Sequence, residues 1–438
     1  NTTGNYNVAV GQNALGSNTT AANNTAVGTA AMEANLAADN TAVGYLAMNA
    51  NTTGNKQVAI GGTALDANTT GGSNTAVGYG SLSANTTANY NVAVGRDALL
   101  LNTTGTNNVA VGANALDANS TGNNSTAIGY GALSASTVDY NVAVGHNALT
   151  ANTTGSTNVA VGPFALDANT TGVQNVALGY EAGSTSTTTH DITAIGHQTL
   201  SLNTGSANTA LGSEAFEANS TASYGTAVGA SALKANTTGA NNTALGYNAM
   251  IVNTTGGYNI AVGSNALDAN TTGSYNTAVG YNSLTANTGE INTAFGNKSL
   301  EANTTGSGNT GIGHQALGDN TTGHNNTAVG YNALKVNTGA GADNVAVGSE
   351  ALAANTTASY NTSVGQLSMN DNTTGASNAA LGYNALAINT TGAHNTAVGA
   401  YALDANTTAD ENTGIGKNAL GANTTGAYGV AVGSGALA

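Results

Sequence analysis

Cysteine and tryptophan are absent from this 438-residue chain, and proline occurs once, at Pro163. Charged residues make up only 6% of the sequence, against about a quarter in an ordinary globular protein. No run of about 18 apolar residues occurs, which excludes a membrane-spanning helix in this segment, and no signal-peptide pattern is present. The lack of cysteine fits an exported protein that is held together without disulfides.

Basic residues are also scarce, because six lysines and arginines face 21 carboxylates and give a formal net charge of −15. No basic stripe exists to follow a phosphate backbone, which argues against nucleic acid as a partner. Low charge combined with few aromatic residues can indicate disorder. Disordered segments, however, lack ordered apolar positions and are rich in proline, and this chain has a strict apolar pattern.

A short repeat fills the sequence in place of these missing features. A glycine that follows an Ala-Val or Ala-Ile type pair, as at Gly78, Gly95 and Gly112, recurs 26 times from Gly11 to Gly433, once in about 17 residues. We call it the marker glycine. Such a fixed short period is typical of a solenoid. We therefore predict one continuous all-β domain over residues 1–438, a parallel β-solenoid of about 26 coils of 17 residues. Because the sequence begins and stops inside a repeat, we expect it to be a fragment of a longer fibre.

Two apolar positions in the repeat predict its inside. The residue before the marker glycine is Val, Ile, Leu or Phe, and the residue four after it is Leu or Met, with Phe at Phe216 and Gly at Gly183. Both positions are predicted to stack into one dry column. Alternation around them predicts strand, glycine corner, strand and polar turn in each coil, and a rod about 125 Å long. The small alanines beside these positions are predicted to face outward and to form the contact between subunits.

A longer period, three times the short one, is also present. Asp66, Asp117, Asp167, Glu217 and Asp268 share one repeat position and recur at every third repeat. Either a block of three coils was duplicated, or one turn of the solenoid takes the whole longer period on three sides. We favour duplication, because two apolar positions in each short repeat already close a flat coil.

The repeat pattern Asn-[Thr/Val]-Ala-[Val/Ile]-Gly-x-x-[Ala/Ser]-Leu-x-Ala-Asn-Thr-Thr-Gly resembles the head repeats of YadA-like trimeric autotransporter adhesins. Residues 125–132, Ser-Thr-Ala-Ile-Gly-Tyr-Gly-Ala, match the first half of that family's repeat closely. Similar repeats occur in some bacteriophage tail fibres. The resemblance implies a left-handed β-roll, a homotrimer and surface adhesion. The family's repeat is usually shorter than the repeat of this chain, and no neck, stalk or anchor is present here, so the trimer is an analogy.

The sequence gives only a weak signal for catalytic or metal-binding residues. Six histidines (His146, His190, His197, His314, His324 and His394) lie at corners or turns without paired spacing, which favours solvated corners over metal ligands. The Asp-x-Asn pair of Leu-Asp-Ala-Asn lacks the further ligands of a calcium loop. Asn-x-Thr sequons recur in most coils, where glycans would collide, so turn ladders explain them better. We expect no catalytic residue, no cofactor and no metal.

Tyrosines mark the candidate contact surface. All 17 lie in or beside predicted turns, and eight directly follow a marker glycine. Aromatic rings there could stack on sugars or pack at a partner interface, or they could cover neighbouring coils, which we favour. The eight candidate contact residues are Tyr45, Tyr79, Tyr130, Tyr180, Tyr247, Tyr281, Tyr331 and Tyr383.

These observations favour an extracellular, non-catalytic fibre that attaches to cells or surfaces, with a host or environmental surface, including glycans, as its partner. A phage tail-fibre shaft is the alternative, on a virion instead of a cell surface. Ice binding through threonine rows is a minor alternative, because Thr-Thr lies in a turn. A depolymerising enzyme is disfavoured, since no coil carries a paired-carboxylate or histidine constellation. Residues 181–191 lose the core leucine and are predicted to form a weak point.

Overall fold

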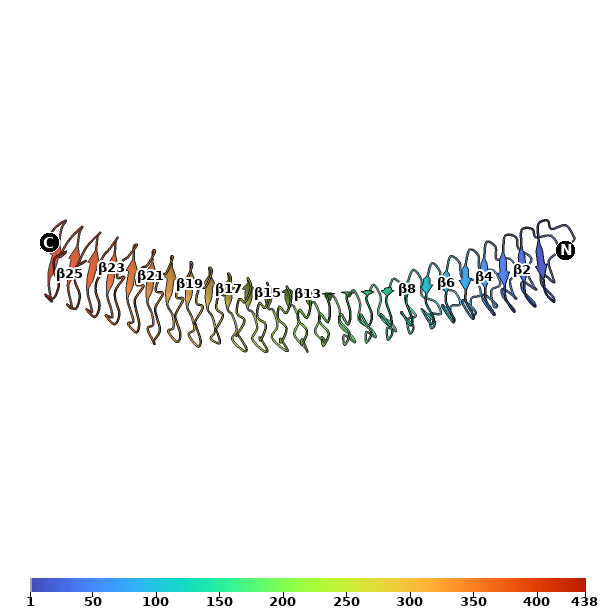
Figure 1. Cartoon of the computed structure of the whole chain (residues 1–438), viewed down its shortest axis with the longest axis horizontal. Coiled ribbons are helices and arrows are strands. Elements are labelled where there is room, and N and C mark those ends of the chain that lie inside the picture. Colours follow the sequence, from blue (N-terminus) through green and yellow to red (C-terminus); the bar gives the residue numbers. More distant parts are fainter. Residues whose placement is uncertain (1) are drawn as a thin grey trace. The chain divides into compact units, whose positions relative to one another are not determined.

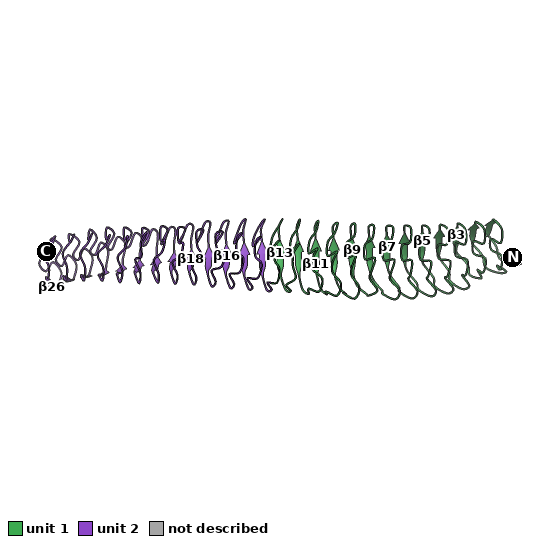
Figure 2. Ribbon diagram, turned by 90° about the horizontal axis from the view of Figure 1, so that it is seen from below, with its two compact units in different colours: residues 1–221 green, residues 222–438 purple. Residues whose placement is uncertain are grey.

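A computed structural model describes residues 2–438 of the chain. The structure divides into two compact units, residues 1–221 and residues 222–438, shown in two colours in Figure 2. Each unit is a parallel β-solenoid with one three-residue strand per coil and no helix among the described residues. The predicted fold class is therefore confirmed.

The strands of the first unit occupy the three residues before each marker glycine (Figure 1). They are β1 (Val8–Val10), β2 (Thr25–Val27), β3 (Thr41–Val43), β4 (Val58–Ile60), β5 (Thr75–Val77), β6 (Val92–Val94), β7 (Val109–Val111), β8 (Thr126–Ile128), β9 (Val142–Val144), β10 (Val159–Val161), β11 (Val176–Leu178), β12 (Thr193–Ile195) and β13 (Thr209–Leu211).

The strands of the second unit follow the same rule. They are β14 (Thr226–Val228), β15 (Thr243–Leu245), β16 (Ile260–Val262), β17 (Thr277–Val279), β18 (Thr293–Phe295), β19 (Thr310–Ile312), β20 (Thr327–Val329), β21 (Val345–Val347), β22 (Thr362–Val364), β23 (Ala379–Leu381), β24 (Thr396–Val398), β25 (Thr413–Ile415) and β26 (Val430–Val432).

Strand register settles the period of the coil. Within each unit every strand pairs in parallel with the next strand in the sequence, so that Val92, Ala93 and Val94 lie beside Val109, Ala110 and Val111. One turn of the solenoid therefore takes one short repeat. The longer period is therefore not one three-sided turn.

The marker glycine is required by the close approach of successive coils. Gly95 has φ +136°, and a Cβ atom on it would lie 2.6 Å from the carbonyl carbon and oxygen of Gly112 in the next coil. Its amide donates to the carbonyl of Val77 in the preceding coil at 2.7 Å. Any side chain would break this stack, and a left-handed φ disfavours all other residues.

The segment after the marker glycine is a series of turns, so the predicted second strand is wrong. Asn114 and Leu116 have φ values of +57° and +51°, in the left-handed region that an extended strand never uses. Hydrogen bonds still run between coils there, as from the Leu116 amide to the Ala132 carbonyl at 3.0 Å. Asparagine and glycine are frequent two residues after the marker glycine because they tolerate this conformation.

Of the two positions predicted to lie inside the coil, one is buried and the other is not. The Leu-type residue is buried, with Leu116 at 0% exposure, and so is the alanine at the centre of most strands, as for Ala110 and Ala160 at 0%. The Val-type residue faces outward instead, and Val161 is 37% exposed. Successive strand residues point to opposite faces, and the coil is so narrow that only the alanine fits inside.

Because the alanines fill the inside, the predicted alanine-lined contact between subunits is wrong. Ala110, in the strand, and Ala115, three residues after the marker glycine, are both 0% exposed within one chain. Neither can therefore reach a second copy.

Two buried columns made mostly of asparagine complete the inside of the coils. In one column, the Asn68 side chain donates to Asn51 Oδ1 at 2.8 Å, and Asn85 donates to Asn68 in the same way. In the other, Asn91 Oδ1 accepts the amide of Asn108 at 2.9 Å. Each satisfied amide contributes on the order of 1 kcal/mol, whereas an unpaired buried amide would be costly. The asparagines of the Asn-Thr-Thr sequons, such as Asn51 and Asn102, are thus ladder residues, as predicted, and both side chains are buried at 0% exposure.

Residues 181–191 keep the register of the ladder, since Val176 pairs with Thr193. Gly183 stands where other coils have leucine, and a Cβ on it would lie 3.4 Å from the Ile192 side chain. Ile192 replaces an asparagine of the second column and is 1% exposed. The isoleucine therefore fills the space that the missing leucine leaves.

Candidate contact surfaces

The outward side of the strands is an uncharged face in each unit. Its first column holds Thr, Val, Ile or Ala, and its second column holds Val, Ile, Leu or Phe, at every strand from β1 to β26. We call these two columns the outer strand face. Many of its large side chains are well exposed, with Ile60 at 40% and Phe295 at 56%. At about 4.8 Å per coil it runs for about 60 Å along each unit.

Sequence reasoning missed the outer strand face, although a signal for it existed. Val-Ala-Val alternates, so only one of the two residue types can enter the coil. The central position is almost always alanine, so it is the position with the tighter limit on side-chain size. This limit indicates that the alanine faces the inside of the coil.

The eight candidate tyrosines lie at the corner beside the outer strand face, directly after the marker glycine. All eight are exposed, from 42% at Tyr383 to 64% at Tyr79. In the first unit they occur at separate coils, so the structure does not gather all of them into one site. It brings Tyr130 and Tyr180 together with other rings.

A track of five rings crosses coils β8 to β12 of the first unit. Consecutive ring centroids along Tyr130, His146, Phe164, Tyr180 and His197 are 5.5, 5.1, 6.1 and 5.6 Å apart. The first and last pairs are stacked, and the two pairs with Phe164 are edge-to-face. Such contacts stabilise neighbouring coils, so the tyrosines at this place cover coils as well as facing solvent.

Smaller ring pairs occur in the second unit. His314 stacks on Tyr331 at 5.5 Å, and Tyr383 lies edge-to-face with Tyr401 at 5.3 Å. A hydrogen bond with Tyr383 raises the pKa of Tyr401. Tyr258 and Tyr275, in a polar turn, stack at 5.2 Å.

All six histidines are exposed, in agreement with solvated corners. His190 Nδ1 accepts the Val173 amide at 3.1 Å, and His324 Nδ1 accepts the Ser307 amide at 3.0 Å, so both link the polar turns of successive coils. Within residues 2–438 no group of three or more His, Asp or Glu side chains is arranged to hold a metal ion. The asparagine of Leu-Asp-Ala-Asn faces inward, as at Asn119, which donates to Asn102 at 3.0 Å.

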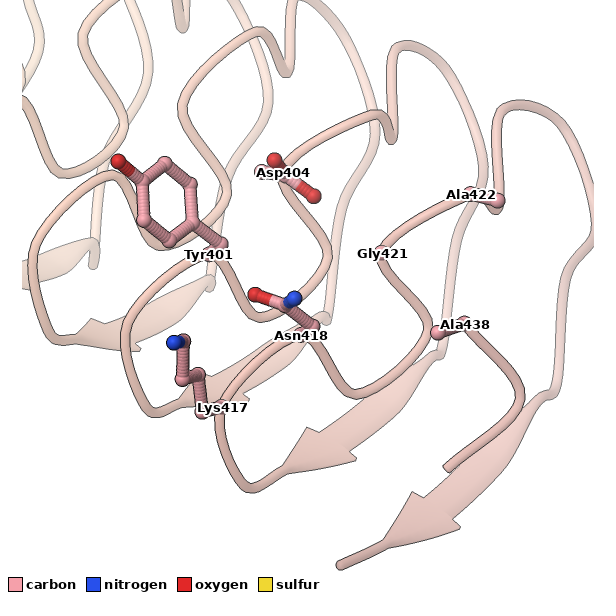
Figure 3. Close-up of a pocket in the computed structure, with 7 residues that line it drawn as sticks. All are labelled: Tyr401, Asp404, Lys417, Asn418, Gly421, Ala422 and Ala438. Carbon is pink, nitrogen blue, oxygen red and sulfur yellow. The ribbon is translucent and has the colours of Figure 1, made fainter. Parts of the chain in front are cut away.

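An open groove lies between successive coils on the turn side of the marker glycine. In the second unit it has a volume of about 470 Å³, and Figure 3 shows Tyr401 and Lys417 at one side and the carboxylate of Asp404 at the other. The lining residues are Tyr401, Asp404, Lys417, Asn418, Gly421, Ala422 and Ala438.

Other carboxylates share the repeat position of Asp404, five residues after the marker glycine. Burial raises the pKa of Asp117, Asp268 and Asp404 above the ordinary aspartate value. Glu301, at the same position, instead pairs with Lys298 at 3.2 Å. The column is thus a series of carboxylates that differ in their surroundings: Glu301 has a cationic partner, whereas Asp117, Asp268 and Asp404 are partly buried.

Scans against protein-family models and curated proteins find no match for this chain. Among the residues that the structure describes, no helix has the length and apolar character needed to cross a membrane.

Proposed function

We propose that this chain forms part of a structural and adhesive extracellular fibre, working without chemistry as a homotrimer on a cell surface or a virion. The observation that carries the proposal is the outer strand face, an uncharged and largely apolar band along all the strands of each unit. Monomeric proteins rarely leave so long an apolar surface in water. The YadA-like resemblance of the repeat supports a partner of the same kind, two further copies of the chain.

Three copies can cover this band by turning their outer strand faces toward a common axis. Val94 and Ile128, for example, would then leave water, and each buried side chain of this size stabilises association by up to about 1.5–3 kcal/mol. Among the described strand residues no carboxylate or ammonium lies on the band, so none would be buried unpaired. The exposed corner tyrosines would remain outside and form the adhesive surface.

The test of association is the solution mass by light scattering, with an expected value of three times 42.3 kDa. Replacing Ile128 and Val161 with lysine should give a folded single chain, because both side chains already face solvent. Thr104→Lys, at an exposed turn position, is the control and should keep the trimer. A monomeric wild-type chain would refute the proposal.

Adhesion is tested separately, by attachment of the labelled fibre to cells or glycan-coated surfaces. Changing the four corner tyrosines of the first unit to serine should reduce attachment at least tenfold without changing the solution mass. Unchanged attachment would remove the adhesive role and leave a shaft, as in a tail fibre. The four residues are Tyr45, Tyr79, Tyr130 and Tyr180.

Ice binding is a second candidate, favoured by one observation. Threonines occupy the first column of the outer strand face in four successive strands, at Thr277, Thr293, Thr310 and Thr327, so regular hydroxyls do lie on a strand surface. Thermal-hysteresis measurement separates the two functions, because clear activity of the single chain would favour ice over association.

A further inference from the structure

A second groove, in the first unit, occupies the same repeat positions as the groove of Figure 3. It lies between the coils of β10 and β11 and has a volume of about 450 Å³. Phe164 and Asp167 of one coil correspond to Tyr401 and Asp404, two and five residues after the marker glycine. Its lining includes Phe164, Asp167, Tyr180, Glu181, Ser184 and Thr185.

The two grooves differ in charge. The lining of the groove of the second unit includes one side-chain carboxylate, that of Asp404, and one ammonium, that of Lys417 (Figure 3). The groove of the first unit holds two carboxylates, Asp167 and Glu181, and none of its described lining residues is a lysine or arginine. Two like charges close together destabilise each other unless a cation lies nearby.

Asp167 also lacks a local partner that the matching carboxylate of another coil has. Asp66 accepts a hydrogen bond from Ser83 at 2.7 Å. Ser184 stands where Ser83 does, but it donates to the carbonyl of Ser201 at 3.2 Å. Among the described residues, Asp167 Oδ1 is therefore buried without a hydrogen-bond partner. Burial raises the pKa of Asp167, and the charge of Glu181 adds to the effect.

Glu181 is held in place and kept ionised. It accepts a hydrogen bond from the Gln198 amide at 2.8 Å. Hydrogen bonds from Gln198 and from Tyr180 lower the pKa of Glu181, and His197 acts in the same direction. The His197 ring stacks on Tyr180, 5.6 Å away between centroids. The groove thus keeps at least one fixed negative charge.

The rings beside these carboxylates suit a cation. Phe164 and Tyr180 lie edge-to-face, with centroids 6.1 Å apart and planes at 85°, so the pair presents a ring face and a ring edge. A cation over an aromatic face gains about 0.5–1 kcal/mol at an exposed site. Carboxylates and a ring face together match an ammonium with an alkyl chain better than a compact, fully hydrated metal ion.

We propose that this groove binds a primary alkylammonium group, of the kind that a lysine side chain carries. Asp167 and Glu181 accept hydrogen bonds from the ammonium, and Phe164 and Tyr180 cover its alkyl chain. The bound ammonium would thus bring a positive charge into a groove that has no cation among its described lining residues, whereas Lys417 lines the groove of the second unit. The proposal does not depend on the trimer, because the groove lies on the turn side of the coil and not on the outer strand face.

Saturation-transfer NMR on the full chain tests this with Nα-acetyl-lysine methylamide as the probe. Nα-acetyl-norleucine methylamide, which lacks the ammonium, is the comparison ligand and should bind at least tenfold more weakly. Asp167→Asn with Glu181→Gln should reduce binding of the lysine probe at least tenfold. Both changes keep the shape of the side chains, and asparagine occurs naturally at this repeat position, at Asn49.

Asp66→Asn is the matched control, because its carboxylate already has Ser83 as a partner, and it should leave binding unchanged. Equal binding of the two ligands, binding retained in the double variant, or no binding by the wild-type chain would each overturn the proposal. Solution mass, measured on the same samples, reports the trimer independently, so failure of one proposal is distinguishable from failure of the other.

Discussion

Alanine and leucine fill the inside of each coil, whereas the valine-type residues of the same strands face outward. The reason is the narrow space across the coil. Gly311 stands at the centre of β19, where most strands have alanine, and a Cβ atom on it would lie 3.0 Å from the Ala316 carbonyl oxygen and 3.4 Å from the Leu300 side chain. A leucine in left-handed conformation, such as Leu116 at φ +51°, is uncommon and costs backbone energy. Its complete burial offsets that cost.

The marker glycine gives a prediction at this scale. Gly95→Ala should destabilise its unit by about 2–4 kcal/mol, because it adds both a clash with the next coil and a disfavoured φ. Thermal melting followed by circular dichroism measures the change.

Gly62→Ala is the control for Gly95→Ala. Its Cβ would lie 3.4 Å from the Tyr79 ring and 4.0 Å from the Tyr45 carbonyl oxygen, both ordinary contact distances. Equal melting temperatures of the two variants would contradict the role given to the marker glycine.

Strand and turn together explain why coils of different length stack in register. In coils of the common length the column asparagine donates to the carbonyl three residues on, as Asn68 does to Gly71 at 3.0 Å. In a coil one residue shorter, the asparagine donates to the carbonyl two residues on, from Asn35 to Ala37. In a coil one residue longer, it donates to the carbonyl four residues on, from Asn337 to Gly341. The polar turn therefore absorbs the difference, and the strands stay aligned.

Coil length, strand position and the buried leucine were predictable from the sequence, because each is fixed by a strict repeat. The direction of Val94 relative to Ala93 was predicted wrongly, because alternation alone leaves both faces open, and only the size limit on the nearly invariant alanine tells them apart. The second strand failed for another reason, because the left-handed φ of Leu116 leaves no trace in its residue type. Of the candidate site, the turn position of the tyrosines was predictable. The groove near Asp167 was not predictable, because the unpaired oxygen of Asp167 results from the choice of acceptor by the Ser184 hydroxyl, which donates to the Ser201 carbonyl.

The compensation between Gly183 and Ile192 gives a prediction at the scale of the element. Gly183→Leu alone should crowd Leu166 and Ile192, and Ile192→Asn alone should leave a cavity, each destabilising the unit by about 2–4 kcal/mol. The double variant restores the common repeat and should approach wild-type stability. Denaturant unfolding of all four proteins measures the coupling.

A coupling below about 0.5 kcal/mol would mean that the isoleucine does not occupy the place of the missing leucine. Gly62→Ala, which lies in a different coil, should add to either single change without coupling.

Across the whole molecule, half-buried carboxylates recur in both units. Burial raises the pKa of Asp117, Asp268 and Asp404, so the folded chain binds protons that the unfolded chain has already released. Stability should therefore rise as the pH falls from neutral through these raised values toward the ordinary aspartate pKa, about 3.9. Melting temperatures at pH 7 and pH 4.5 measure this directly.

Changing these three aspartates to asparagine should raise the melting temperature at pH 7 and remove most of the pH dependence. The matched control removes the same charge from three exposed turn positions, by Asp191→Asn, Glu290→Gln and Glu411→Gln. It should change the melting temperature at pH 7 and the pH dependence less than the first triple variant does. Equal effects of the two triple variants would show that net charge, and not burial, sets the dependence.

The turn that absorbs one residue cannot absorb many, and this constrains how such a chain changes length. If a whole coil is inserted, its glycine, alanine, leucine and asparagine each stack on the same residue type in the neighbouring coils. If half a coil is inserted, leucine would stack on glycine in all the coils that follow. Growth and shrinkage during evolution should thus proceed in whole multiples of the repeat, and each added repeat should lengthen the solenoid by about 4.8 Å.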